Sequence, residues 1–256
     1  MRVHHLNCGS LRFPGAPLVC HVLLIESSDG LVLVDTGFGL ADIADPSRLG
    51  PARRLVRPVL DPAETAIRQV EKLGFAASDV RDVVVTHFDL DHIGGLADFP
   101  SAAVHVTATE ARAAVHSPSW QERQRYQSAQ WAHGPRLVEH PVGGDTWNGF
   151  TGAHEILPGV VLIPLPGHTR GHAAVAVDNG RLLHAGDSFF HRGTLERKPI
   201  PWSLRLNERA VAFDAARVRS NHARLAELHQ AGSGTTVFCA HDPVQFEALA
   251  EADRYH

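Results

Sequence analysis

Two histidines and two aspartates lie within six consecutive positions of the segment THFDLDHIGG, residues 86–95. Imidazole and carboxylate groups are the side chains that bind divalent ions such as zinc. His87, Asp89 and Asp91 are spaced two positions apart, so a chain that leaves an extended strand can direct them towards one centre while it turns. The glycine pair that follows favours such a turn. The segment therefore predicts a metal site formed by His87, Asp89, Asp91 and His92.

Three further metal-binding side chains follow apolar runs in the second half of the chain. They are His168 in PLPGHTRGH, Asp187 at the end of LLHAGD and His241 at the end of VFCAH. Each of them, taken alone, is typical of a turn cap or a buried polar residue. Together with the first segment they supply four histidines and three carboxylates. That set is sufficient for two divalent ions that share one carboxylate and one water.

Rigid strands must position these side chains, and the chain contains two similar sets of strands and helices. Loops that leave the carboxyl ends of strands are held by the sheet but stay open to solvent, so reactive groups gather there. In the first half, β-branched apolar runs predict strands over 19–27, 31–37, 80–87 and 102–107, with helices over 61–75 and 109–117. In the second half, strands are predicted over 159–167, 172–178, 181–187 and 235–241, with one helix over 207–232.

Length and composition favour one large α/β domain over residues 1–256, since 44% of the residues are hydrophobic and 20% are charged. Residues 118–150 break the periodicity and are interpreted as an insertion. Its aromatic residues could wall an apolar pocket or form a contact between two copies of the chain, which leaves a homodimer open. They are Trp120, Tyr126, Trp131 and Trp147.

The charge balance excludes several classes of partner. The formal net charge is −4, whereas binding to nucleic acid or to an anionic membrane requires a basic surface. No apolar run has the length of a signal peptide core or a membrane span, so a cytoplasmic location is expected. The four arginines of residues 48–58 indicate either a solvated face or a lid that selects a carboxylate-bearing substrate.

The set of motifs resembles the metallo-β-lactamase superfamily. The resemblance rests on HxxxDH in the first loop, on GHTxGH, on strands that end in GD and in His, and on LVDTG at 33–37. It covers nearly the whole chain and implies a four-layered αββα sandwich with metal-dependent hydrolase activity. Length and spacing are most similar to the N-acyl-homoserine lactonases, and the glyoxalase II thioesterases are a more distant likeness.

The resemblance also implies roles for individual residues. One metal ion would be held by His87, Asp89 and His168, and a second by Asp91, His92 and His241, with Asp187 bridging the two and Asp35 orienting ligands. A hydroxide that bridges the two ions would attack a small-molecule ester, lactone or thioester. Asp91 would hold that hydroxide and pass its proton to the leaving oxygen.

Two positions depart from the pattern of these hydrolases. Asp89 stands where most of them have histidine, and a carboxylate favours iron or manganese without excluding zinc, the metal that the family implies. The same residue suggests a di-iron redox protein as an alternative from another class. Phe190 stands where the homoserine lactonases have a tyrosine that contacts the lactone carbonyl, so this position supplies no hydroxyl.

Overall fold

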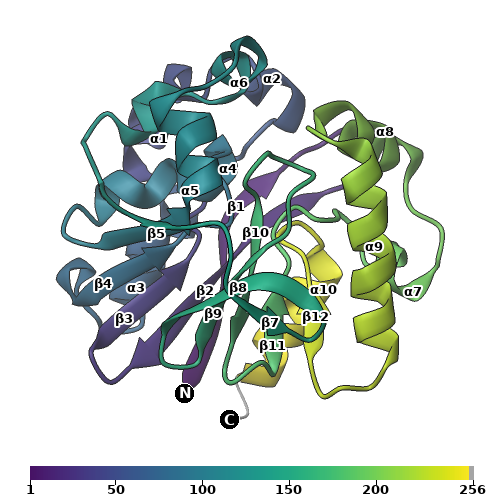
Figure 1. The fold of residues 1–256 in the computed structure, drawn as a ribbon. Coiled ribbons are helices and arrows are strands. Elements are labelled where there is room, and N and C mark those ends of the chain that lie inside the picture. The colour runs from purple at the N-terminus through teal and green to yellow at the C-terminus, as the bar shows by residue number, and fades with distance from the viewer. Residues whose placement is uncertain (254–256) are drawn as a thin grey trace.

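Each half of the chain builds one six-stranded sheet, and the two sheets pack face to face (Figure 1). The structure is a computed structural model that describes residues 1–253. The first sheet has the order β1-β2-β3-β4-β5-β6, with strands Arg2–Leu11, Leu18–Ser27, Gly30–Val34, Val80–Val84, Ala103–Thr107 and Arg136–His140. The second has the order β12-β11-β10-β9-β8-β7, with strands Thr236–Phe238, Leu182–His184, Ala173–Val177, Val160–Pro164, Phe150–Leu157 and Asp145–Trp147.

The helices cover the outer faces of the two sheets (Figure 1). On the first half lie α1 (Leu40–Ala44), α2 (Arg53–Val56), α3 (Ala66–Lys72), α4 (Leu90–Ile93), α5 (Ala108–Ala111) and α6 (Trp120–Arg125). On the second half lie α7 (Gly193–Glu196), α8 (Trp202–Val211) and α9 (Ala215–Gln230), whereas α10 (Pro243–Asp253) contacts β1 and β2 of the first sheet. None of the helices in the described part of the chain is long and apolar enough to cross a bilayer.

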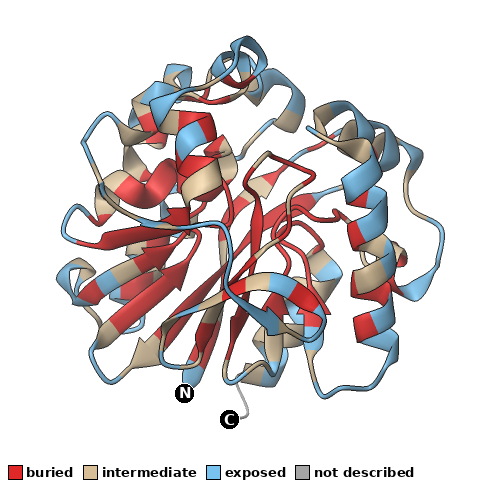
Figure 2. Ribbon diagram, in the orientation of Figure 1, coloured by how far each residue is buried: buried red, intermediate tan, exposed pale blue. Residues whose placement is uncertain are grey.

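Three apolar layers hold this arrangement together. Between the sheets, Ile25 and Val84 of the first pack with Val175 of the second, and all three are fully buried. The outer face of the first sheet packs against Val70 of α3, and the outer face of the second sheet packs against Leu225 of α9. Figure 2 shows the strands as the most buried part of the molecule. The four-layered αββα sandwich predicted from the sequence is therefore confirmed.

Two predicted helices were wrong in their extent. The segment 61–75 begins with a single 3₁₀ turn capped by Asp61, and α3 starts only after Thr65, whose backbone is extended. The segment 207–232 is interrupted at Ala212, which is also extended, so α8 and α9 are separate helices. The Asp214 side chain accepts the first free N–H groups of α9, which is the N-cap arrangement that starts a new helix.

Several elements carried too little apolar periodicity to be predicted. Strands β1, β6, β7 and β8 and helix α10 were missed, and β1 and β8 mix buried and partly exposed residues along their length. Residues 118–150 contain α6, β6 and β7, and β6 forms the edge of the first sheet beside β5. Short edge strands with polar residues give only a weak sequence signal.

Candidate metal centre

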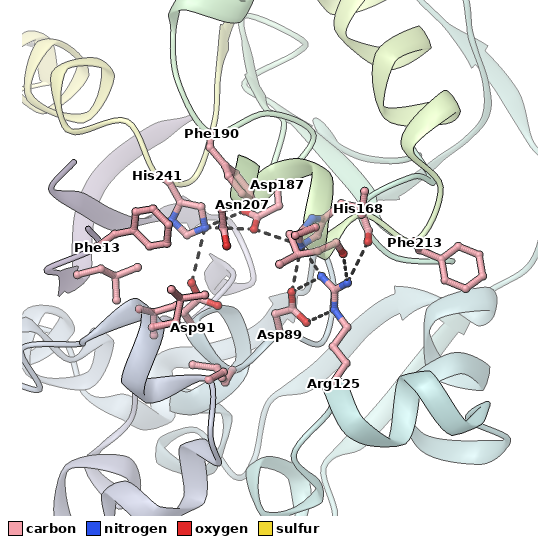
Figure 3. Close-up of a pocket in the computed structure, with 18 of the residues that line it drawn as sticks. Phe13, Asp89, Asp91, Arg125, His168, Asp187, Phe190, Asn207, Phe213 and His241 are labelled. Atoms are coloured by element: carbon pink, nitrogen blue, oxygen red, sulfur yellow. Dashed lines mark hydrogen bonds and ion pairs between the residues drawn. The ribbon is translucent and has the colours of Figure 1, made fainter. Parts of the chain in front are cut away.

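The structure brings all seven predicted ligand side chains together beyond the carboxyl ends of four strands. Figure 3 labels Asp89, Asp91, His168, Asp187 and His241 among them. Strands β4, β11 and β12 each end three residues before a ligand position, not at the ligand itself as predicted. The donor atoms form two groups whose members lie within 4.8 Å of one another. We call them the first cluster, His87, Asp89, His168 and Asp187, and the second cluster, Asp91, His92 and His241.

The loop after β4 is shaped by close backbone packing. Gly94 has a helical φ of −56°, so it does not form the turn expected of the glycine pair. A Cβ atom on Gly94 would lie 2.2 Å from Asp42 Oδ2, and one on Gly95 would lie 2.9 Å from the Thr36 carbonyl oxygen. The glycines therefore let the loop after β3 approach the start of this helical segment. That approach places His92 in α4 beside the end of β3.

The second cluster has the spacing that a divalent ion requires. His241 Nε2 lies 3.0 Å from Asp187 Oδ1 and 3.6 Å from Asp91 Oδ2, and His92 Nε2 lies 3.2 Å from Asp187 Oδ1. Tetrahedral donors at about 2.1 Å from a zinc ion are about 3.4 Å apart. His92 Nε2 and Asp187 Oδ1 are also buried without a hydrogen-bond partner among residues 1–253. These residues fit a divalent cation.

Neighbouring groups orient His87, His92 and His241 so that each Nε2 faces its cluster, whereas His168 Nδ1 has no hydrogen-bond partner among the described residues. The Nδ1–H of His92 donates to Asp35 Oδ2 at 2.8 Å, and that of His241 donates to the Val19 carbonyl at 2.8 Å. The Thr86 hydroxyl donates to Asp35 and accepts from His87 Nδ1 at 3.0 Å. Such contacts fix the tautomer in which Nε2 carries the free lone pair, as metal-binding histidines require.

Asp35 connects the ends of β3 and β4 behind the second cluster. It is buried, has a left-handed φ of 60°, and accepts the Thr86 N–H at 2.8 Å as well as the contacts already given. Burial acts to raise the pKa of Asp35, but the facing His92 imidazole outweighs it and holds this pKa below its ordinary value. The ionised carboxylate therefore orients His92 and increases its basicity.

Replacing Asp35 with asparagine is expected to weaken metal binding by about 10- to 100-fold, the usual cost of losing such an orienting contact. Asparagine tolerates the left-handed backbone, so the change removes the charge and leaves the fold. Isothermal titration of the apo-protein with Zn²⁺ measures the effect. The matched control is Asp82→Asn, which removes another aspartate contact, to His105 Nε2 at 2.9 Å, away from both clusters. An unchanged affinity in Asp35→Asn would contradict the orienting role.

The second cluster carries an excess of negative charge. Burial acts to lower the pKa of His241, but the Asp187 carboxylate outweighs it and raises this pKa to about 9. Burial likewise opposes the charged form of His92, yet Asp187 and Asp35 hold its pKa well above the ordinary value. Both shifts arise because the carboxylates near these histidines have no counter-ion other than the imidazoles. The cluster is thus suited to attract a cation.

The first cluster is equally compact but contains a cation of its own, Arg125, at the end of α6. His168 Nε2 and His87 Nε2 lie 3.0 and 3.3 Å from Asp89 Oδ2. Arg125 Nη2 lies 2.5 Å from the same carboxylate oxygen and 2.6 Å from His168 Nε2, and Arg125 Nε lies 2.6 Å from Asp89 Oδ1 (Figure 3). The guanidinium therefore forms a two-pronged pair with Asp89.

This ion pair determines the protonation of the first cluster. Burial acts to raise the pKa of Asp89, but the Arg125 guanidinium outweighs it and holds this pKa well below its ordinary value. Burial and the same guanidinium lower the pKa of His168 to about 4. Asp89 is consequently a carboxylate and His168 a neutral imidazole, in contrast to the histidines of the second cluster.

Arg125 is not among the residues predicted from the sequence to form the site. It lies 36 positions from Asp89, in the segment interpreted as an insertion, and no spacing rule connects the two. One signal was present, because a buried carboxylate in place of histidine adds a negative charge that requires a partner. The sequence could therefore indicate that a cation was needed, but not which one of the 24 lysines and arginines supplies it.

A second unpredicted residue, Glu110 of α5, ties the loops of the first cluster together. Its Oε1 accepts the Phe88 N–H at 3.0 Å and the Tyr126 hydroxyl at 2.9 Å. Its Oε2 accepts the Thr169 hydroxyl at 2.7 Å and the Gly171 N–H at 3.0 Å. Glu110 is fully buried, so one side chain satisfies three donors from the loops that carry His87 and His168 and a fourth from Tyr126, which follows α6.

His172 holds the carboxylate that faces both clusters. Its Nδ1–H donates to the Leu165 carbonyl at 3.1 Å, and its Nε2 accepts the Asp187 N–H at 3.0 Å. His172 is thus a buried core residue with a hydrogen bond at each ring nitrogen. The backbone of Asp187 is thereby fixed.

The clusters line a cavity of about 590 Å³ whose other walls are largely apolar. Phe190 is one of these walls, with ring centroids 5.7 Å from His168 and 5.4 Å from His241, and it offers no hydroxyl. From the arginine-rich segment 48–58, the side chains that line the cavity are Ala52, Leu55 and Val56. The further apolar lining residues are Leu11, Phe13, Leu18, Leu90, Ala210, Val211, Ala212 and Phe213. The uncharged polar ones are Gln121, Gln124 and Asn207, and the charged ones outside the clusters are Glu122 and Arg125.

Comparisons with known proteins agree with this geometry. A family model described as the metallo-beta-lactamase superfamily matches residues 15–228. A protein of Mycobacterium tuberculosis named probable metallo-hydrolase is 55% identical over 250 residues, which span 95% of this chain and 81% of that protein. An N-acyl homoserine lactonase of Rhizobium johnstonii is 27% identical over 243 residues, 91% of this chain and 85% of that protein.

One solved structure is similar over almost the whole length. It is an N-acyl homoserine lactone hydrolase with the product N-hexanoyl-L-homoserine bound at its catalytic metal center. The TM-score is 0.72 at 20% identity, covering 96% of this chain and 95% of that chain. At 20% sequence identity, this similarity supports a shared fold only.

Proposed function

The chain belongs to the metallo-β-lactamase superfamily and is a metallo-hydrolase, and from this premise we propose that it cleaves the ester bond of a lactone or ester with an apolar acyl group. One observation carries the proposal: paired carboxylate and imidazole donors line a cavity whose remaining walls are mostly hydrocarbon. The named lactonases among its relatives support the same bond type. We further propose zinc as the metal, with iron and manganese as alternatives.

The residues of the second cluster, with Asp187, would hold a divalent ion, which when bound supplies a Lewis acid and makes a nearby water more acidic. Asp91 would accept the proton of the attacking water, because its carboxylate lines the cavity and lies 3.6 Å from His241 Nε2. The same carboxyl group would return the proton to the leaving oxygen. Asp187 keeps its place because His172 binds its backbone.

The cavity lining favours an acyl chain over a carboxylate-bearing group. The segment 48–58 was considered as a lid that selects carboxylates, but it presents apolar side chains such as Leu55 and Val56 to the cavity. Its Arg48 instead pairs with Asp42 at 3.1 Å. Phe13, Phe190 and Phe213 extend the apolar surface on both sides of the clusters (Figure 3). Burial of methylene groups along these walls would therefore provide binding free energy.

The test of this function is turnover of a series of lactones and open-chain esters by protein loaded with Zn²⁺, Mn²⁺ or Fe²⁺. Each buried methylene is worth about 0.8 kcal/mol, so we expect kcat/KM to rise about fourfold per added methylene until the cavity is filled. Thioesters of the same acyl groups are the comparison series. Turnover of thioesters alone would favour the glyoxalase II-like alternative, and no turnover of any ester with any metal would contradict the proposal.

The di-iron redox alternative depended on Asp89 as a hard, charged ligand. Asp89 has another partner, since both of its carboxylate oxygens accept hydrogen bonds from Arg125. The argument for iron from this residue is thereby weakened. Elemental analysis of protein purified without added metal identifies the ion. Oxygen consumption in the presence of a reduced flavoprotein would favour the redox alternative.

A further inference from the structure

All five N–H donors of the Arg125 guanidinium have partners, and these partners include two of the donor atoms that the first metal ion would need. A guanidinium carries five N–H groups. Nε and Nη2 bind Asp89 and His168 Nε2, as described above. Nη1 donates to the main-chain carbonyls of His168 at 3.1 Å and of Val211 at 2.6 Å. The side chain is thus fixed from two directions.

The Nε2 lone pair of His168 is consequently occupied, whereas His87 Nε2 in the same cluster has no hydrogen-bond partner among the described residues. A neutral imidazole nitrogen has one lone pair in the ring plane, and an arginine can only donate, so His168 Nε2 accepts from Arg125. That lone pair is then unavailable to a metal ion. A divalent ion at the same donors would also lie a few ångströms from the guanidinium, where two positive charges repel strongly. The carbonyl contacts of Nη1 oppose displacement of the side chain.

Among the three ligand carboxylates and Arg125 alone, without Asp35 or a hydroxide, the charges balance with one ion and not with two. The three candidate ligand carboxylates are Asp89, Asp91 and Asp187. Arg125 neutralises one of them directly, which leaves two negative charges for one divalent ion. A second divalent ion would leave the buried centre positively charged, a state that burial makes costly. The negative excess lies at the second cluster, where no arginine or lysine pairs with Asp91 or Asp187 within the described residues.

We infer that the Arg125 guanidinium takes the place of a cation in the first cluster, so that the centre holds one divalent ion per chain, bound by the second cluster and Asp187. This inference rests on the proposed metal-dependent function and changes the expectation of two ions that came from the family resemblance. It also gives Asp89 a physical role. A carboxylate matches the planar fork of a guanidinium, whereas a histidine at this position could not neutralise it.

The experiment counts bound ions. Apo-protein is loaded with Zn²⁺ or Mn²⁺, dialysed against buffer and analysed by ICP-MS and native mass spectrometry. We expect about one ion per chain in the wild type and about two in Arg125→Met, which frees Asp89 and His168 and keeps an unbranched side chain. Arg125→Lys, which retains the positive charge, is expected to hold about one. With Mn²⁺, the paramagnetic resonance signal should change from that of an isolated ion to that of a coupled pair in Arg125→Met.

The control is Arg48→Met, which breaks another arginine–aspartate pair, with Asp42, and should leave the count at one. Two ions per chain in the wild type would overturn the inference, as would a single ion in a folded Arg125→Met. If Arg125→Met does not fold, the number of ions bound by the wild type still tests the inference. The double variant Asp89→His with Arg125→Met removes both members of the ion pair, so it leaves no unpaired charge and should hold two ions per chain. A wild type that binds no ion would overturn the proposed metal-dependent function, which is a distinguishable outcome.

Discussion

Replacing His241 with alanine is expected to remove the bound ion and to lower kcat/KM by at least about 1000-fold. His241 Nε2 is the donor that faces both Asp187 and Asp91, at 3.0 and 3.6 Å. Loss of an orienting contact alone costs about 10- to 100-fold in affinity or activity, so loss of the ligand itself should cost more. Without the ion, the acidification of water and the Lewis acid are both lost. The measurements are ion content after dialysis and turnover of the best ester or lactone substrate.

His168→Ala is the matched comparison for ion content. Both residues are buried imidazoles in loops that follow strands, but His168 Nε2 accepts a hydrogen bond from Arg125 and is not part of the second cluster. We expect His168→Ala to retain about one ion per chain. Thermal unfolding of the two apo-variants should be similar, because both loops tolerate a smaller side chain. A His241→Ala protein that kept a full ion and its turnover would show that the second cluster is not the metal site.

Replacing Glu110 with alanine is expected to lower the free energy of unfolding by about 3 kcal/mol. The change would leave four buried donors without an acceptor, and each unsatisfied buried donor costs about 1 to 3 kcal/mol before water enters the space. The donors come from Phe88, Tyr126, Thr169 and Gly171, so the loops after β4 and β9 would lose their common anchor. Urea unfolding of the apo-protein measures the loss directly.

The control for Glu110 is Glu71→Ala, which removes a surface carboxylate. Glu71 is 43% exposed and pairs with Arg68 at 2.7 Å, so its replacement should cost less than about 1 kcal/mol. A Glu110→Ala protein within about 1 kcal/mol of the wild type would mean that water satisfies the four donors. Metal affinity of this variant is a second readout, because the segment after β4 that Glu110 anchors also carries Asp91 and His92.

The candidate ligands of the centre and the general fold could both be predicted from local patterns in the sequence. Runs such as VVVT and LLHAG are local patterns, and a strand followed by His87 or Asp187 is recognisable without any knowledge of its neighbours. The motif set then implied the αββα sandwich, which the two face-to-face sheets confirm. Elements with weak periodicity were not predictable, as with β1, and neither was the interruption between α8 and α9 at Ala212.

The groups that contact the predicted ligands could not be predicted, because they come from distant segments of the chain. Arg125 reaches Asp89 across 36 positions and Glu110 reaches Gly171 across 61, and neither distance along the chain corresponds to a helical or strand period. Periodicity reports which face of an element is buried, but not which other segment covers that face. The charge of the first cluster depends on the packing of α6 against the loop after β4. The donor residues were therefore predictable from local patterns, whereas the charged groups that pair with them depend on long-range packing.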